Sequence, residues 1–189
     1  DGAGAGDFIL ASDLHDFDSV AATITWTGPT TGVLIIESVD DANCDAYSPG
    51  AKERTTSGVT ADIDMSGLIA CWGFVLTAAD DYRLLNSGSE FYGYDMTFGP
   101  MPSNSVLSTS ADGQLFQLYN PSFDFSAVQT KLWNPGSAGT VRIYGGSIVR
   151  SGGGTTISNL TSANWNGCGA SLEMYGVDIS DIASVLFNN

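Results

Sequence analysis

A short apolar strand that ends in an aromatic residue, followed by a tight turn and a second alternating strand, recurs along this chain. Its clearest copy is Val141 to Val149, in which Tyr144 precedes a turn at Gly145. Four other copies place the turn directly after an aromatic residue: Trp72 with Gly73, Tyr92 with Gly93, Tyr119 with Asn120, and Tyr175 with Gly176. The aromatic residues follow one another at steps of 20, 27, 25 and 31 residues. Repeats of this length are typical of solenoids, in which each repeat packs on its neighbours.

A stacked coil explains why these residue types recur. Each turn of the coil needs corners, and Gly or Asn suits a corner because both tolerate a positive φ. Apolar residues alternate along the strands, so one set can point into a shared interior. We expect the aromatic residues before the corners to stack on their counterparts about 4.8 Å away in neighbouring turns. A second apolar element follows each aromatic residue at a similar distance, at Leu85, Leu107, Leu132, Ile157 and Leu186.

The sequence therefore predicts an all-β fold, a short right-handed parallel β-helix (β-solenoid) of about five to six irregular rungs. The alternative is an antiparallel β-sandwich in which aromatic-glycine pairs mark hairpins. The hairpin signals Asn-Gly and Asp-Gly occur only at Asp112-Gly113 and Asn166-Gly167, which favours the β-helix. We expect residues 1–7 to be a flexible N-terminal arm, 8–58 to be an N-terminal β segment that caps the solenoid, and 59–189 to hold the repeats.

Charge excludes two classes of partner. The 189 residues fit one domain and carry 21 acidic and six basic side chains, for a formal net charge of −15. Nucleic acids and anionic membrane surfaces bind clustered Lys and Arg, so we expect neither as a partner. No apolar run of 18 residues predicts a membrane span.

Acidic residues near the turns are the candidate metal ligands. Asp62, Asp64, Asp95, Asp124 and Asp178 are the candidates, and the last three occupy similar places after a turn. If these three formed a column on one face, their like charges would repel unless a cation lay between them. The pattern therefore predicts either a calcium site or a solvated edge, and no other cofactor.

Catalytic residues do not form a coherent set in the sequence. The single histidine, His15, lies between Asp13 and Asp16, and a solvated loop is the better interpretation than a general base. No Lys or Arg repeats in phase with the acidic residues, so we expect no enzymatic activity. Trp165, between Asn164 and Asn166, is the candidate for an exposed sugar-binding ring. The pairing of Cys44, Cys71 and Cys168 is not determined by their spacing.

Several segments carry a resemblance to a known class. They are Phe8-Ile9-Leu10-Ala11-Ser12-Asp13, Trp26-Thr27-Gly28, Val33 to Asp41, and Leu172 to Ser180. Their order resembles virion structural proteins of marine tailed bacteriophages that have β-helix-like repeats. The resemblance spans most of the chain and implies a component exposed on the virion, either a head decoration protein or part of a tail spike or fibre. It also implies an oligomer in contact with other virion proteins, and it carries over no functional residue.

The leading hypothesis is thus a non-enzymatic virion protein, assembled as a homo-oligomer for which we favour a trimer. A second hypothesis is a β-helix that binds or degrades polysaccharide in a receptor-binding spike. A third is an adhesin module on a bacterial surface.

Overall fold

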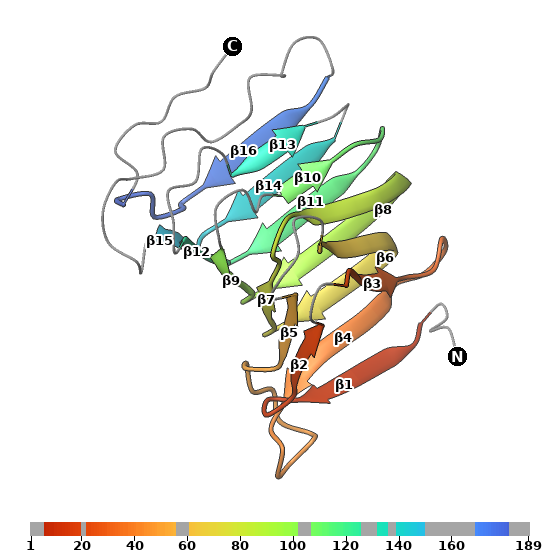
Figure 1. Cartoon of the computed structure of the whole chain (residues 1–189), viewed down its shortest axis with the longest axis vertical. Helices are drawn as coiled ribbons and strands as arrows, with labels where there is room; N and C mark the ends of the chain where they lie inside the picture. Colours follow the sequence, from red (N-terminus) through yellow and green to blue (C-terminus); the bar gives the residue numbers. More distant parts are fainter. Residues whose placement is uncertain are drawn as a thin grey trace.

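The computed structural model describes residues 6–19, 22–55, 61–101, 107–125, 132–135, 139–149 and 169–181. Within these residues the named elements are all β-strands. Figure 1 shows them stacked along the long axis of the molecule, from β1 at the lower end to β16 at the upper end. Among the described residues there is no helix that could serve as a membrane span.

Three columns of parallel strands run along this axis. The first column is the main path of a ten-stranded sheet and contains β1 (Phe8–Ser12), β4 (Leu34–Val39), β6 (Ile63–Trp72), β8 (Tyr82–Tyr94), β11 (Leu115–Tyr119), β14 (Thr140–Tyr144) and β16 (Ser171–Tyr175). The second column is a six-stranded sheet of β2 (Asp16–Ser19), β5 (Lys52–Thr55), β7 (Val75–Thr77), β9 (Thr97–Met101), β12 (Ser122–Phe125) and β15 (Ser147–Val149). The third column combines β3 (Ile24–Thr27), β10 (Leu107–Thr109) and β13 (Trp133–Pro135) with the first parts of β6 and β8.

The chain visits the three columns in turn before it begins the next level. Strands β1, β2 and β3 form the first rung, and β4, β5 and the start of β6 form the second. Every pairing between named strands is parallel. The fold is therefore a β-helix, as the repeat predicted, and the antiparallel sandwich is wrong. The first column has seven levels, more than the aromatic signature alone indicated.

The N-terminal segment belongs to the same coil. We predicted that residues 8–58 form a cap, but β1 pairs with β4 and β4 pairs with β6 in the same parallel register as the later levels. The segment supplies the first rung and most of the second instead of covering the end. The predicted boundary at residue 59 falls within a rung, because the first two rungs lack the aromatic-turn signature from which the boundary was drawn.

The corner between the first and second columns begins with the same backbone conformation at five levels. A residue with positive φ follows the last residue of the strand: Gly73, Asp95, Asn120, Gly145 and Gly176, with φ values of 71°, 50°, 51°, 67° and 65°. Hydrogen bonds between levels continue through the corner, because Asp95 N donates to Tyr119 O and Asn120 N donates to Tyr144 O. Glycine and asparagine are common here because this conformation strains most side chains.

One predicted corner was placed two residues too early. We predicted Tyr92 with Gly93, but Tyr94 occupies the register position of Trp72 and Tyr119, and Asp95 is the corner residue. Gly93 is a buried residue within β8, aligned with Leu118. Tyr92 and Tyr94 lie on the same face of the strand, so strand periodicity could not choose between them.

The interior is a continuous apolar core along the described rungs. Ile69, Phe91, Phe116 and Val141 follow one another at one register position and are fully buried. Phe98 stacks on Phe123 in the second column, with centroids 4.9 Å apart. The buried phenol of Tyr82 donates to Leu76 O at 2.9 Å and accepts from Ala78 N at 3.1 Å. The buried Tyr82 hydroxyl is thus paired both as a donor and as an acceptor, as its buried position requires.

The apolar residues predicted to follow each aromatic residue lie in the third column only in part. Leu107 begins β10 and Leu132 immediately precedes β13, and both are fully buried. Leu85 is half-buried, while its neighbour Leu84 is the interior residue. Ile157 and Leu186 lie outside the described residues.

Candidate functional site

The end of the β-helix that carries the first rung is open. Among the described residues β1, β2 and β3 each pair with a strand on one side only, namely β4, β5 and β6. The other edge of each strand therefore presents backbone groups that no described strand satisfies. Unpaired edges of this kind are templates for pairing with another chain.

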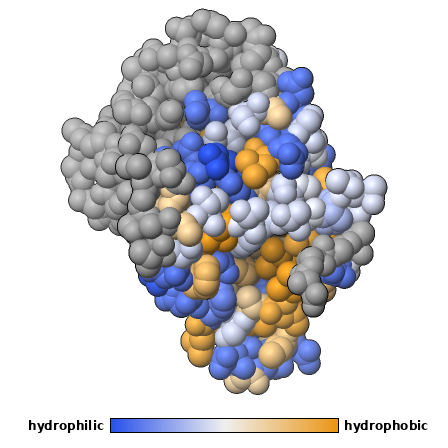
Figure 2. Space-filling view, turned by 45° about the vertical axis from the view of Figure 1, so that its right-hand side comes forward, coloured by the Kyte–Doolittle hydropathy of each residue, from blue (hydrophilic) through white to orange (hydrophobic). Residues whose placement is uncertain are grey.

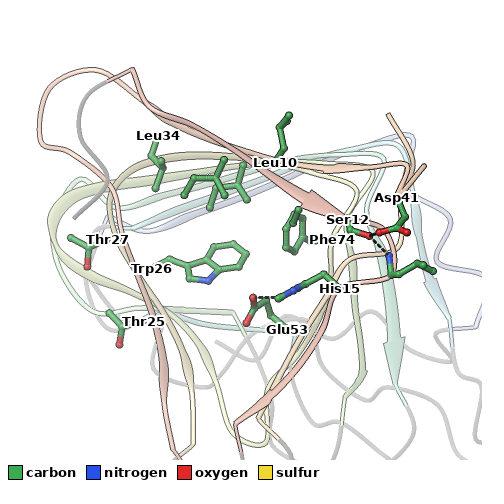
Figure 3. A pocket seen from close by; sticks show the side chains of 14 residues that line it. Leu10, Ser12, His15, Thr25, Trp26, Thr27, Leu34, Asp41, Glu53 and Phe74 are labelled. Atoms are coloured by element: carbon green, nitrogen blue, oxygen red, sulfur yellow. Dashed lines mark hydrogen bonds and ion pairs between the residues drawn. The ribbon is translucent and has the colours of Figure 1, made fainter. Parts of the chain in front are cut away.

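A cavity of about 820 Å³ occupies this end. Figure 3 shows that the side chains of Trp26, Phe74 and Leu34 project into it, while Leu10 lies at its edge. Phe74 is almost fully buried and packs edge-on against Trp26 with ring centroids 5.7 Å apart. The floor of the cavity is therefore the apolar core seen from its end.

Exposed apolar side chains concentrate on the same rung. Of the seven large hydrophobic residues exposed in the described chain, five lie between Phe8 and Phe17: Phe8, Ile9, Leu10, Leu14 and Phe17. Leu14 is the most exposed, at 73%. Figure 2 shows hydrophobic surface gathered in the lower part of the molecule, where the first rungs lie. An apolar patch of this kind is typical of an interaction surface.

A histidine and a glutamate form the polar contact at the rim of the cavity. His15 Nε2 lies 2.9 Å from Glu53 Oε1, and the two are drawn together in Figure 3. Glu53 aligns with Leu76, an interior residue, so its carboxylate points toward the core and needs this partner. His15 therefore does not join Asp13 and Asp16 in a cluster, and the prediction of a solvated loop missed the contact because Glu53 lies far away in sequence.

Three further polar contacts lie along the rim at this end. Arg54 Nη2 lies 2.6 Å from Asp16 Oδ1, and Ser12 Oγ donates to Asp41 Oδ1 at 2.7 Å. Ser48 Oγ donates to Asp13 Oδ2 at 2.7 Å. These contacts fold the loop after β4 onto the first rung. They stabilise the shape of the opening without closing it.

The predicted acidic column does not assemble. Asp95 is a corner residue that accepts a hydrogen bond from Asn120 Nδ2 at 2.8 Å. Asp124 lies within β12, aligned with Val149, whereas Asp178 bridges to Ser147. The three residues thus occupy three different register positions. Backbone and side-chain hydrogen bonds from Ser180 hold the pKa of Asp178 below its usual value.

Asp62 and Asp64 both form ion pairs with Arg83. Arg83 contacts Asp62 Oδ2 at 2.7 Å and Asp64 Oδ1 at 2.8 Å. Burial raises the pKa of Asp62, while the backbone N–H of Asp81 and the Arg83 guanidinium act in the opposite direction. The described residues contain no group of three His, Cys, Asp or Glu side chains that could hold a metal ion. Cys71 is buried and Cys44 exposed, both as free thiols, and Cys168 and Trp165 lie outside the described residues.

An aromatic ladder runs along the outer face of the first column. We use this name for Trp72, Tyr94, Tyr119, Tyr144 and Tyr175, whose successive ring centroids lie 4.5, 4.9, 5.1 and 5.2 Å apart. The predicted stacking is therefore confirmed for four of the five predicted aromatic residues, with Tyr94 in place of Tyr92. The rings lie outside the core, because the first four are half-buried and Tyr175 is exposed.

Polar side chains flank the aromatic ladder. Tyr92 donates a hydrogen bond to Glu90, and Gln117 donates to the phenol of Tyr119. Burial, together with the hydrogen bond to Glu90, raises the pKa of Tyr92 to about 12. Arg142 Nε lies 3.2 Å from Glu173 Oε2. The sequence identified the ring positions but not these flanking groups, which become neighbours only once the register is known.

Comparison of the chain with protein-family models, with curated proteins and with solved structures gave no match.

Proposed function

We propose that this protein is a non-enzymatic structural component of a tailed-phage particle, exposed on its surface and assembled as a homo-oligomer through the open end of the β-helix. The single observation that carries the proposal is the first rung, where unpaired strand edges, an apolar cavity and five exposed apolar side chains coincide. The resemblance to β-helical virion proteins supplies the biological setting.

A second copy of the chain is the occupant that fits this end. Its own first rung offers a strand edge for β1 and apolar side chains for Leu10 and Leu14, so the same surface can serve both partners. The high negative charge opposes the contact, because each copy carries a formal net charge of −15. Screening shortens the range of this repulsion, so association should strengthen with salt.

The described side chains offer no arrangement that favours catalysis over assembly. The contact of His15 with Glu53 is the one place where a titratable pair borders the cavity within the described residues, and its geometry is explained by the burial of Glu53. The lining is otherwise mostly apolar and hydroxyl-bearing. Such a lining suits the burial of apolar surface against another protein chain.

Sedimentation of the purified chain over a range of protein and salt concentrations tests the assembly. We expect the fraction of associated chains to rise with both concentrations, and a double variant Phe8→Ser with Leu14→Ser to remain monomeric. Tyr47→Ser is the control, because Tyr47 is also an exposed large side chain, at 44%, but lies outside the first rung. A wild-type chain that stays monomeric at all concentrations would overturn the proposed assembly.

Imaging of purified phage particles with an antibody against this chain tests the setting. We expect label at regular positions on the particle surface. Recovery of the protein only as a free secreted monomer would remove the virion role.

A further inference from the structure

Beyond this structural role, we propose that the aromatic ladder is a binding site for a linear, uncharged polysaccharide laid along the axis of the β-helix. The ladder lies on the outer face of the first column, and none of its members lines the cavity at the open end. The two surfaces can therefore act independently.

The repeat of the ladder suits a polymer. Its five rings occupy one register position on consecutive levels, with separations between 4.5 and 5.2 Å. One sugar unit of an extended polysaccharide has a similar length. A chain aligned with the axis would meet an equivalent group at each level.

The groups that the ladder presents suit hydroxyl-rich ligands. Neighbouring rings cover one another's faces, as in the pair of Tyr94 and Tyr119 with an interplanar angle of 5°. The outward parts are therefore ring edges and phenol hydroxyls, and each hydroxyl can both donate and accept a hydrogen bond. Among the described residues no side chain forms a hydrogen bond with the phenol of Tyr94 or of Tyr144, so either phenol can donate to and accept from a ligand.

Space for a ligand lies beside the last rings. A Cβ added at Gly176 would meet no atom within 4 Å, and one added at Gly145 would meet only Asn120 Oδ1, at 4.0 Å. These glycines follow Tyr175 and Tyr144 directly, so among the described residues no side chain crowds the two rings at this corner. The amide of Asn120, already oriented by its contact with Asp95, lies at the edge of this space.

Charge restricts the ligand to uncharged chains. Glu90, Asp95 and Glu173 are the acidic groups that border the ladder, and the single guanidinium among its described flanking residues, Arg142, contacts Glu173. An acidic polysaccharide would meet this negative border without a free cation to offset it. A neutral chain meets no such barrier.

Affinity electrophoresis and calorimetry with soluble polysaccharides test the proposal. The probes are neutral β-1,4-glucan, β-1,3-glucan, galactan and mannan chains, with alginate as the acidic comparison. We expect retention by at least one neutral chain and none by alginate. Absence of binding to every neutral probe, or preference for alginate, would overturn the proposal.

Two conservative variants locate the site. Tyr94→Phe combined with Tyr144→Phe keeps the stacked rings but removes the two available hydroxyls, and should weaken binding about tenfold. Asn120→Gly keeps the left-handed corner and removes the amide, and should weaken it severalfold. Ser147→Ala, on the outer face of the second column, is the matched control and should bind as the wild type does. Binding that is unchanged in both ladder variants would show that the site lies elsewhere.

The double variant Phe8→Ser with Leu14→Ser separates this inference from the proposed assembly. It should bind polysaccharide with the wild-type intrinsic affinity even where it no longer forms oligomers. Loss of oligomers with retained binding would support both proposals, whereas oligomers without any binding would overturn this one alone.

Discussion

Two aromatic columns in this β-helix have the same spacing but lie in different environments. Phe98 and Phe123 stack inside the coil with centroids 4.9 Å apart and are fully buried. Tyr94 and Tyr119 stack on the outer face, also 4.9 Å apart, and are half-buried. The distance between parallel strands sets the separation in both cases. Stacking geometry therefore does not reveal how much a ring contributes to stability, because burial decides it.

The inner column should show the largest effect. Phe123→Ala removes a ring from the core and leaves a cavity between Phe98 and Ile148, so we expect a loss of about 3 to 5 kcal/mol in the free energy of unfolding. Urea denaturation followed by circular dichroism measures it. A loss below about 1 kcal/mol would mean that the core adapts around the cavity. Inner and outer rings would then not differ in their contribution to stability.

Tyr119→Ala breaks the outer column at its centre. The substitution removes a ring that stacks on both Tyr94 and Tyr144. Because this site is open to water, no closed cavity forms. We expect a loss of about 1 to 2 kcal/mol by the same denaturation assay. A loss as large as that of Phe123→Ala would show that the outer rings are part of the core.

Alkaline pH should reduce the stability that the outer-face phenols of Tyr92 and Tyr94 contribute. Burial raises the pKa of Tyr92 to about 12 and also raises that of Tyr94, whereas a phenol in the unfolded chain titrates near 10. The folded state therefore prefers the neutral phenols. Their contribution is fully present below pH 10 and is lost as pH rises toward 12.

Denaturation at a series of pH values should accordingly show the free energy of unfolding falling between about pH 10 and 12. Tyr92→Phe should make this fall shallower, while Phe123→Ala should leave its slope unchanged. An equally steep fall in Tyr92→Phe would assign the effect to other groups, such as the buried Tyr82.

Removing one hydroxyl from the ladder should have the smallest effect. Tyr119→Phe keeps the stacked ring and loses only the contact with Gln117, so we expect a change within about 0.5 kcal/mol. Thermal unfolding at neutral pH measures it. A larger loss would show that the hydroxyls stabilise the fold themselves, and the role proposed for them in ligand binding would then need separate evidence.

The sequence predicted the architecture because the determining signal is local. Tyr144 with Gly145 and Tyr119 with Asn120 each combine a strand end with a residue that tolerates positive φ, and such pairs mark one corner per level. The corner at Asp95 was missed because Gly93 offered a more obvious turn residue two positions earlier. Whether Tyr92 or Tyr94 stacks in the ladder depends on how β8 aligns with the strands of the neighbouring levels, and this register is a non-local property.

The sites depended on contacts that the sequence does not encode locally. The open end became visible only when β1 proved to have a partner on one side, and the pairing of His15 with Glu53 joins residues from different rungs. The sequence also did not determine whether the stacked aromatic rings lie inside or outside the core. Strand alternation divides residues into two faces but does not say which face lies inside when both carry large apolar side chains, as Phe91 and Tyr92 do.

The corner after the aromatic ladder has a consequence for how such a chain can change in length. From Trp72, Tyr94, Tyr119 and Tyr144 onward the same number of residues leads into the second column, and interlevel hydrogen bonds continue through each of these turns. An insertion here would shift one level against the next and break bonds on both sides. The loop between β4 and β5 also connects the first column to the second but is much longer than these turns, at a level where Glu37 and not an aromatic residue aligns with Trp72. Extra residues are therefore accepted at this edge where the ladder is absent. Growth in evolution should therefore proceed by duplication of whole levels or by extension of corners that carry no ladder ring, while the turns that follow the ladder keep a constant length.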